Sequence, residues 1–436
     1  MKKWKHALLA GIAACTVMTA TASAASFEST ATAMKSMGLF AGTSTGYELD
    51  RAPTRAEAAT MLVRLLGKTA EAETLWASSK DTFAFRDMDA FDWAQPYVHW
   101  LARSGLAAGT SADRFSPADP CTAQMYAAFL MRALGYSEAD GDFSFENVLA
   151  FARSHGVIND VNCDTKTFLR DHVVAASYTA LASAPKSGEA DLLTKLVNSG
   201  AVSASAASME QQKFSAYRGY VQTMQPAAEG AALENVTSIS VSGGLSLDVA
   251  AVSESRLSGN RLSTQSSLTI TVPGDDPFVQ ERTGYYADGR WYTNADGVKT
   301  WKPAALDELL QQLALPEAAP LVLLDEIRIG SAEYYLTYSA AGRAYYQEYF
   351  KLLAHTLGGT PAMDQLSISG LNAEIRVADG VLSSLSTSVT ASGKLSGGTA
   401  GTEITMRAQQ NSKVSAVGSE VTVNTPDDLS SYTPST

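Results

Sequence analysis

The 436-residue chain has few cysteines and histidines and more acidic than basic residues. It holds three Cys, five His, 45 Asp or Glu and 33 Lys or Arg, which gives a formal net charge of −12. The histidines are scattered, no two cysteines stand at a zinc-binding spacing, and the glycine patterns that bind phosphates or dinucleotides are missing. The acidic balance argues against general binding to nucleic acid or to anionic membranes. We therefore expect no metal, no cofactor and no nucleic-acid partner.

Catalytic motifs are also scarce. Residues Gly42 to Gly46 fit the Gly-x-Ser-x-Gly pattern of hydrolases through Ser44, but a helical pattern precedes them where that motif requires a strand. Paired carboxylates such as Asp275 and Asp276 stand in proline-bearing turns, where solvated loop residues are the ordinary outcome. We expect a protein that is not an enzyme.

Long apolar runs are absent except near the N-terminus. There, three lysines precede an apolar stretch at residues 7–20 and a small-residue site at residues 22–24. This order is typical of a secretory signal, and we place cleavage after Ala24, so that residues 1–24 form the signal peptide. Loss of the three lysines would take the formal charge from −12 to −15. Cys15 leaves an alternative open, because the segment ending there resembles the lipobox at which bacterial lipoproteins are lipidated.

The exported part keeps two cysteines, Cys121 and Cys163. Two cysteines in an exported protein can form a disulfide, or they can be two small buried apolar residues. Sequence spacing does not tell whether their Cα atoms come within bridging distance, so both alternatives stay open.

Two segments repeat the same start of a helix. Thr54 and Glu57 form the Thr-x-x-Glu pattern of a capping box before an apolar run, which predicts a helix from there to Gly67. Thr122 opens a second such helix, which ends at Gly135, again 13 residues later.

Each of these helices follows a shorter amphipathic one. In the second copy Trp93, Tyr97 and Leu101 stand at helical spacing, and the pattern ends at Gly105. A weaker third copy follows, with its second helix at about residues 169–182. The pattern thus predicts three helix-loop-helix units.

These units resemble S-layer homology (SLH) repeats, whose signature is present in Thr54-Arg55-Ala56-Glu57 and, over its whole length, in the segment from Phe85 to Thr122. We assign SLH repeats to residues 27–70, 83–137 and 140–185, the last of them degenerate. In that family three such units close into an all-α, pseudo-threefold bundle. Grooves between the units bind pyruvylated sugars of secondary cell-wall polysaccharide through the motif arginine together with loop backbone and polar groups.

The three copies differ at the motif. The second has Thr122-Ala123-Gln124-Met125, which keeps the cap and loses both charges, and the third has Leu169-Arg170-Asp171-His172, which keeps the arginine. The resemblance therefore implies one competent groove, near Arg55 and the loop Gly42 to Gly46. The residues that it implies for glycan binding are Arg55, Thr54, Glu57, Gly42, Ser44, Asp87, Trp93 and Arg170. The alternative to a binding role is that Arg55 is a solvated first-turn residue and Trp93 a core residue.

Residues 186–230 form a predicted linker that is rich in Gly, Ala and Ser. We expect two helices in it, at Glu189 to Asn198 and at Met209 to Met224, followed by a hinge at Gln225 to Gly230. A linker with helical pieces separates the repeats from the second half of the chain.

Residues 233–429 follow the period of β-strands. Ile239 and Val241 alternate with polar neighbours, and Asp-Gly pairs at residues 288–289, 296–297 and 379–380 predict hairpin turns. Two helices interrupt the strands, one opened by Pro303 and one from about Ala341 to Leu357. A final run of strands ends at residues 421–429. This order predicts an α+β domain with an antiparallel curved sheet and a helical insert.

The segment Tyr285 to Tyr292, with Lys299-Thr300-Trp301 and the closing segment Thr425 to Leu429, resembles the half-barrel lipoprotein-carrier (LolA/LppX-like) family. That resemblance implies a curved antiparallel sheet with helices against its concave face. Such a half-barrel either encloses an apolar ligand or is filled by its own side chains, and both alternatives stay open.

The sequence as a whole predicts a multidomain, exported bacterial surface protein. We expect non-covalent attachment to secondary cell-wall polysaccharide through the SLH repeats, with the C-terminal domain as a structural or ligand-binding module. The alternative is an extracytoplasmic carrier for an apolar small molecule, whose SLH repeats no longer bind the wall.

Overall fold

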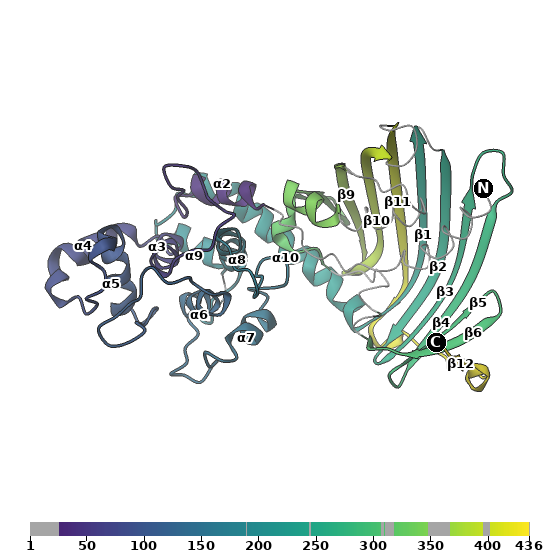
Figure 1. The fold of residues 1–436 in the computed structure, drawn as a ribbon, viewed down its shortest axis with the longest axis horizontal. Helices are drawn as coiled ribbons and strands as arrows, with labels where there is room; N and C mark the ends of the chain where they lie inside the picture. The colour runs from purple at the N-terminus through teal and green to yellow at the C-terminus, as the bar shows by residue number, and fades with distance from the viewer. Residues whose placement is uncertain are drawn as a thin grey trace. The chain divides into compact units, whose positions relative to one another are not determined.

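The computed structural model describes residues 26–188, 190–243, 246–306, 309, 318–347, 367–395 and 402–435. Contacts divide the chain into two compact units (Figure 1), which we call the helical unit (Ser26–Ser215) and the sheet unit (Ala216–Ala319 with Leu323–Thr436). The expected signal peptide and Cys15 lie outside the described residues. None of the helices described combines the length and the apolar character needed to cross a membrane.

The helical unit is built from short helices joined by loops. Its elements are α2 (Glu28–Ser36), α3 (Arg55–Leu65), α4 (Thr69–Ser79), η1 (Lys80–Thr82), η2 (Asp89–Ala94), α5 (Gln95–Arg103), α6 (Ala123–Ala133), α7 (Val148–Ser154), α8 (Arg170–Ala182), α9 (Leu192–Asn198) and the first part of α10 (Ala204–Glu229). Most side chains of α3, α6 and α8 are buried, so these three helices supply much of the core of the unit.

The ends of α3 and α6 follow from local chemistry. The Thr54 hydroxyl accepts a hydrogen bond from the N–H of Glu57 (3.2 Å), and the Glu57 carboxylate accepts one from the N–H of Thr54 (2.9 Å), so the predicted capping box is confirmed. Thr122 caps α6 through a backbone N–H at 3.2 Å. Both helices are followed by a glycine of positive φ, Gly67 (64°) and Gly135 (89°), in the region where a Cβ is strained.

The two cysteines of the helical unit are free thiols. Cys121 and Cys163 are each 2% exposed, and burial raises the pKa of Cys121 to about 12 and that of Cys163 to about 11. In the structure the two cysteines form no disulfide, and both pack as small apolar side chains. Buried thiols of this kind are unreactive, because little thiolate forms at neutral pH.

Two helices of this part of the chain differ from the prediction. α4 forms between the first two expected repeats, where no helix was predicted. α10 continues through Pro226 to Glu229, although a hinge was expected there. The proline lacks the N–H that would donate to the carbonyl four residues earlier, but it stands in the last turn, so the disturbance is confined to the end of the helix.

The sheet unit contains an open, curved sheet of 12 strands in the order β12-β6-β5-β4-β3-β2-β1-β11-β10-β9-β8-β7 (Figure 1). The strands are β1 (Gly230–Gly243), β2 (Leu247–Ser258), β3 (Arg261–Thr271), β4 (Phe278–Ala287), β5 (Arg290–Ala295), β6 (Val298–Pro303), β7 (Leu324–Ile329), β8 (Glu333–Tyr338), β9 (Ser367–Ala378), β10 (Val381–Leu395), β11 (Thr402–Val417) and β12 (Thr433–Pro434). Neighbours are antiparallel except β12 and β6, which pair in parallel, so the expected antiparallel sheet is in fact mixed. This long-range pairing has no local signal in the sequence.

The predicted turns and the predicted alternation are confirmed. Asp288, Asp296 and Asp379 have φ values of 50°, 50° and 52°, and each precedes a glycine of positive φ, as the tight turns of twisted hairpins require. Ile239 is 4% exposed, whereas Val236, on the other face of β1, is 43% exposed. The strands therefore have one buried and one more open face.

Two predicted boundaries in the sheet unit are wrong. Pro303 ends β6 instead of opening a helix, and the end of a strand tolerates a residue without an N–H. Residues 421–426 have no regular structure where a final strand was expected. Much of the two expected helices, including residues 310–317 and 348–357, lies outside the described residues.

Candidate functional site

Loops of the helical unit hold the N-termini of α3 and α8 in the same way. The N–H of Arg55, the first residue of α3, donates to the carbonyl of Asp119 (2.9 Å), and the N–H of Arg170, the first residue of α8, donates to the carbonyl of Arg51 (2.9 Å). In each helix the next N–H donates to the carbonyl two residues earlier in the same loop (3.1 and 3.0 Å). The first N–H groups of a helix lack partners inside it, and these loops supply them. The two arginines thus occupy equivalent positions.

The side chain of Arg55 is buried against the loop at residues 108–116 and is 5% exposed. Its Nε donates to the carbonyl of Phe115 (2.9 Å), its Nη2 donates to the carbonyl of Ala108 (3.3 Å), and the guanidinium carbon lies 4.8 Å from the centre of the Phe115 ring. Burial lowers the pKa of Arg55 from its usual value, although an arginine keeps its charge in proteins. The alternative of a solvated first-turn arginine is therefore wrong.

Arg170 has a different set of partners at the matching position. It is 3% exposed, and its Nε donates to the carbonyl of Tyr47 (3.1 Å), the counterpart of Phe115. Its Nη1 lies 3.5 Å from a carboxylate oxygen of Glu57. The buried charge of Arg170 is therefore compensated within the protein.

Arg55 lacks the corresponding carboxylate. Its Nη1 meets the sulfur of Met125 (3.5 Å), and Met125 stands three residues after the cap of α6, as Glu57 does after the cap of α3. Among the ion pairs of the described residues, none includes Arg55. The desolvation of the Arg55 guanidinium is offset only in part, because the charges of Asp119 and Asp87 act on it without pairing with it directly. We call this arrangement of Arg55, Ala108, Phe115 and Met125 the Arg55 site.

Glu57 belongs to a closed ionic network. Arg51 donates to both of its carboxylate oxygens (2.8 and 2.5 Å) and is itself paired with Glu48 (2.6 Å). Burial alone would raise the pKa of Glu57, but hydrogen bonds from Arg51 and Thr54 and the charge of Arg170 hold it below its usual value. The network leaves neither Glu57 nor Arg170 in need of an outside partner.

Asp87 shapes the loop against which Arg55 packs. Its carboxylate oxygens accept the N–H groups of Phe115 (2.9 Å) and Ser116 (2.8 Å). Burial would raise the pKa of Asp87, but these two hydrogen bonds hold it below its usual value. Ser116 has a φ of 57°, and the same left-handed geometry recurs at Glu48 (49°) in the equivalent loop. Asp87 therefore positions the Phe115 carbonyl that receives Arg55.

The structure separates residues that the sequence placed together. The loop Gly42 to Gly46, which contains Ser44, leads into Tyr47, whose carbonyl meets Arg170, whereas the side-chain contacts of Arg55 lie in the loop at residues 108–116 and in α6. The expected groove of Arg55 with Gly42 to Gly46 has no support in these contacts. Which loop receives each arginine depends on how the helix-loop-helix repeats pack within the helical unit. That packing has no local sequence pattern.

Trp93 is 50% exposed, and its ring packs on that of Phe91 with 6.3 Å between the ring centres. It is therefore not a core residue. α5 begins only at Gln95, so that Trp93 lies outside the helical turns that bury Tyr97 and Leu101.

Met125, Ala108 and Phe115 were missed as site residues. Alignment of the motifs shows that Met125 replaces a glutamate, but not which arginine faces it. In the third copy His172 takes the capping role of that glutamate, since its Nδ1 accepts the N–H of Leu169 (2.9 Å).

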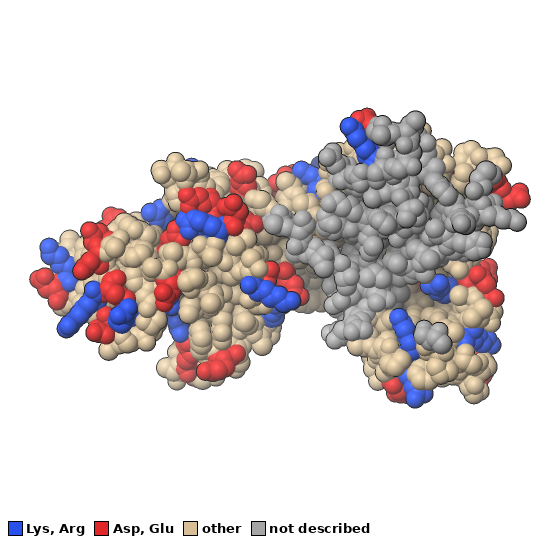
Figure 2. Space-filling view, in the orientation of Figure 1, with Lys and Arg blue, Asp and Glu red and all other residues tan. Residues whose placement is uncertain are grey.

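Charges of both signs are mixed on the surface of the helical unit. On the face shown in Figure 2, Lys and Arg side chains are interspersed with Asp and Glu over the helical unit. In the described part of the chain, no three His, Cys, Asp or Glu side chains gather as the ligands of a metal ion would.

Comparison with known proteins identifies part of the chain. Residues 84–122 match the family model of the S-layer homology domain, and they lie within the second of the three predicted repeats. A cell surface protein of Thermoanaerobacter kivui is 28% identical over 116 residues, which are 27% of this chain and 14% of that protein. An endoglucanase of Bacillus sp. (strain KSM-635) is 32% identical over 88 residues, 20% of this chain and 9% of the enzyme. The chain thus spans only a small part of the length of these relatives.

Two solved structures align with about half of the chain. They are LprF from Mycobacterium bovis, at 12% identity and a TM-score of 0.27, and a LolA-superfamily protein from Nitrosomonas europaea, at 10% identity and a TM-score of 0.19. The alignments cover 49% of this chain and 97% and 95% of those proteins. At TM-scores this low they carry no weight for the sheet unit.

Proposed function

We propose, from the S-layer homology domain at residues 84–122, that the helical unit attaches an exported protein non-covalently to secondary cell-wall polysaccharide. The observation that carries the proposal is the buried guanidinium of Arg55, whose neighbours are two carbonyls and the Met125 sulfur instead of a carboxylate. An anionic group on the polymer would supply a directly paired counter-charge. The name of the Thermoanaerobacter kivui relative, a cell surface protein, supports a location at the cell surface.

A pyruvylated sugar suits the Arg55 site by its chemistry. A pyruvyl group adds a carboxylate to a neutral sugar, and the planar fork of an arginine binds a carboxylate through charge-assisted hydrogen bonds. Ala108 and Phe115, whose carbonyls hold the guanidinium, both lie within the residues that match the S-layer homology domain. Arg170 takes no part in this proposal, because Glu57 compensates it.

Co-sedimentation of the purified full chain with isolated cell-wall sacculi tests the proposal. We expect the chain to sediment and Arg55→Met to weaken binding at least about tenfold, since it keeps apolar bulk and removes the charge. Arg103→Met, at an exposed position of α5, is the matched control and should bind like the wild type. Circular dichroism of each variant checks that it is folded.

Each outcome bears on a separate part of the proposal. Failure of the wild-type chain to sediment would overturn wall attachment. Sedimentation that Arg55→Met leaves unchanged would keep attachment and remove the Arg55 site. Loss of binding in both arginine variants would point to general charge attraction and would also remove the site.

A second candidate function, ligand binding by the sheet unit, rests on the more buried face of its strands. Ile239, Val249 and Ile270, which are paired across β1, β2 and β3, are each 4% exposed and form an apolar row. Such a row either contacts an apolar ligand or packs under side chains of the unit itself. Solvent extraction of the purified chain followed by mass spectrometry tests for a bound lipid. An extract identical to that of a buffer blank would count against this candidate.

A further inference from the structure

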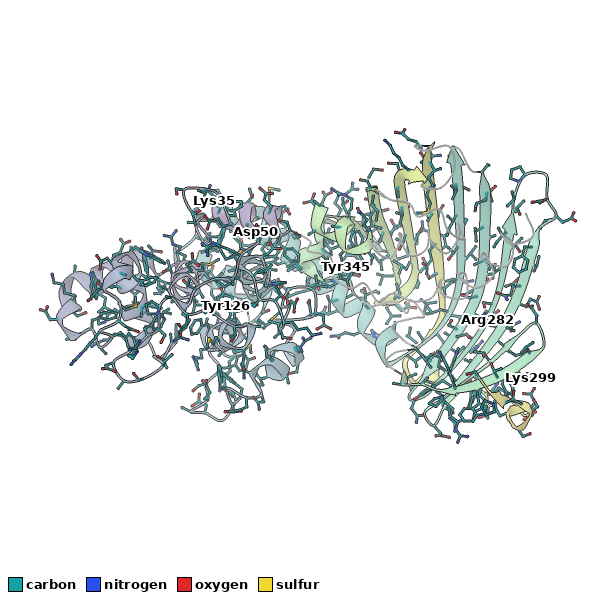
Figure 3. The ribbon with its side chains drawn as sticks, viewed as in Figure 1. Lys35, Asp50, Tyr126, Arg282, Lys299 and Tyr345 are labelled. Atoms are coloured by element: carbon teal, nitrogen blue, oxygen red, sulfur yellow. The ribbon has the colours of Figure 1, made fainter. Side chains whose placement is uncertain are left out.

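The open sheet has two edges, and they differ. One edge is β12, which is two residues long, contains Pro434 and pairs with β6. A proline has no N–H to donate, and so short a strand offers little backbone for pairing. Lys299, labelled in Figure 3, forms an ion pair (2.6 Å) with Asp428 in the segment that leads into β12. This edge is poorly suited to the addition of a further strand.

The other edge is β7, which pairs with β8 and, in the described part of the chain, with no other strand. It has six residues, none of them proline. In the hairpin that joins β7 to β8, the N–H of Gly330 donates to the carbonyl of Glu333 (2.8 Å). Hydrogen-bonded and non-hydrogen-bonded pairs alternate along an antiparallel ladder. The backbone groups of Arg328 therefore face β8, and those of Ile327 and Ile329 face outward, where they can meet another strand.

Two side chains of opposite charge lie on the same face of this edge. Glu326 and Arg328 stand two residues apart on β7 and lie opposite Thr337 and Tyr335 of β8. The side chain of Glu326 is 57% exposed and that of Arg328 is 65% exposed, with 3.5 Å between their charged groups. An exposed pair of this kind adds little to stability. Both charges are therefore accessible to a partner.

The order of these charges makes the edge complementary to itself. When two copies of β7 pair antiparallel about Ile327, each Glu326 lies opposite Arg328 of the second copy. The outward backbone groups of the two Ile327 residues then exchange both of their hydrogen bonds. Opposite charges that face each other across two strands stabilise the pairing, and like charges oppose it.

Other symmetric registers lack this complementarity. The smallest shift that keeps the outward backbone groups opposite each other is two residues. In one direction it places Glu326 opposite Glu326, and in the other it places Arg328 opposite Arg328. In the register about Ile327, Asp325 falls opposite Ile329, so that no like charges meet. Ile329, 63% exposed in one chain, gains the Ile327 of the second copy as a diagonal neighbour.

We propose that two copies of the chain pair through β7 into a symmetric dimer with one continuous sheet. The two-fold axis passes through the Ile327 pair at right angles to the sheet, and two ion pairs between Glu326 and Arg328 flank it. The same edge serves both copies and the β12 edge is poorly suited to pairing, so that association ends at two chains. The dimer depends neither on wall attachment nor on ligand binding by the sheet unit.

Charged residues on an edge strand can also serve to prevent pairing. Charges of one sign do this, because they repel each other when two identical edges meet. The exposed face of β7 instead carries one acidic and one basic side chain, Glu326 and Arg328, on either side of the central residue. That arrangement turns repulsion between identical edges into attraction.

Multi-angle light scattering of the purified full chain, over a concentration series, tests the proposal. We expect the mass to rise from that of one chain to that of two. Glu326→Arg and Arg328→Glu each place like charges opposite one another and should raise the dissociation constant at least about tenfold. The double variant Glu326→Arg/Arg328→Glu restores the opposite charges and should dimerise like the wild type. Arg256→Glu reverses an exposed charge on β2, away from both edges, and is the matched control.

Cysteine cross-linking tests the register without reversing a charge. In the proposed dimer, residue 326 of one copy and residue 328 of the other form a non-hydrogen-bonded pair with about 4.5 Å between their Cα atoms, which a disulfide can bridge. An oxidised mixture of the Glu326→Cys and Arg328→Cys variants should therefore give a covalent dimer on a non-reducing gel. Either variant alone should give little, because no two introduced cysteines lie opposite each other.

A mass of one chain throughout the concentration series would overturn the proposal. A dimer that the single charge reversals weaken no more than Arg256→Glu does, or that the double variant fails to restore, would place the contact elsewhere and overturn it as well. Cross-linking of either cysteine variant alone, as strong as that of the mixture, would exclude the register about Ile327. Circular dichroism checks that each variant is folded.

Discussion

Arg55 and Arg170 are the same residue type at the first position of two helices, and each donates its Nε proton to a loop carbonyl. Each also lies near a methionine sulfur, that of Met125 for Arg55 and that of Met61 for Arg170, but only Arg170 has a carboxylate beside it, that of Glu57. In the proposed mechanism of attachment, the carboxylate of Glu57 occupies the charge of Arg170, whereas the charge of Arg55 has no directly paired carboxylate among the described residues.

Met125→Glu should bring a carboxylate to Arg55. The new ion pair would compensate the guanidinium as Glu57 compensates Arg170, so we expect a higher unfolding temperature and at least about tenfold weaker wall binding. Scanning calorimetry and co-sedimentation measure the two effects. Met125→Gln, of similar length but uncharged, should bind like the wild type. Undiminished binding by Met125→Glu would contradict the role of a free charge at Arg55.

Asp171 leads to a pH dependence of stability. It is 7% exposed, accepts the N–H of Phe27 (2.8 Å), and burial raises its pKa to about 7. The folded pKa lies above the unfolded one, so that between the two values the folded state binds a proton that the unfolded state has lost. The contribution of this group to the free energy of unfolding is therefore fully present below about pH 4. It is lost as the pH rises through 7.

We expect this group to lower the free energy of unfolding by up to about 4 kcal/mol as the pH rises across that range. Denaturant titrations at several pH values measure the effect. Asp171→Asn keeps an acceptor for Phe27 and has no titrating carboxyl, so its profile should be flatter. Identical profiles for the variant and the wild type would rule out the raised pKa.

At the scale of helices and strands, the predictions that hold depend on a few neighbouring residues. The caps at Thr54 and Thr122 and the turns at the Asp-Gly pairs are examples. α4 was missed because the repeat pattern has no place for it, although its Ala and Glu residues favour a helix. β12 pairs with Thr300 and Trp301, far away in the sequence, and no short pattern signals such a contact.

Gly67 and Gly135 offer a matched test of helix ends. Alanine at either position meets the strain of a left-handed backbone, about 1 kcal/mol. A Cβ on Gly67 would also lie 2.6 Å from the Cβ of Ala201, whereas on Gly135 the nearest atom is the Cβ of Lys186 at 3.8 Å. We expect Gly67→Ala to lower the free energy of unfolding by at least about 1 kcal/mol more than Gly135→Ala. Equal losses in urea titrations would argue against this packing of Gly67.

At the scale of the whole molecule, contacts divide the chain into the helical unit and the sheet unit, each with its own buried core. We expect two transitions in scanning calorimetry, because separate cores unfold as separate cooperative units. Gly67→Ala should move one transition, and Asn235→Leu, which removes a buried oxygen without a partner in the described part of the chain, the other. A single transition that both substitutions shift would contradict this division.

The sequence by itself determined the features that depend on residues close together in the chain. The helix caps, the glycines that follow the helices and the Asp-Gly turns follow from hydrogen bonds and backbone angles within a few residues. It also indicated, by resemblance, the domain that residues 84–122 match.

Only the tertiary structure decided which groups meet. Arg55 reaches a carbonyl 60 residues away, Met125 and not a carboxylate faces it, and β7, with Glu326 and Arg328 on one face, forms an edge of the sheet. These contacts depend on how helices pack and on strand register, where a shift by one residue would move a side chain to the other face.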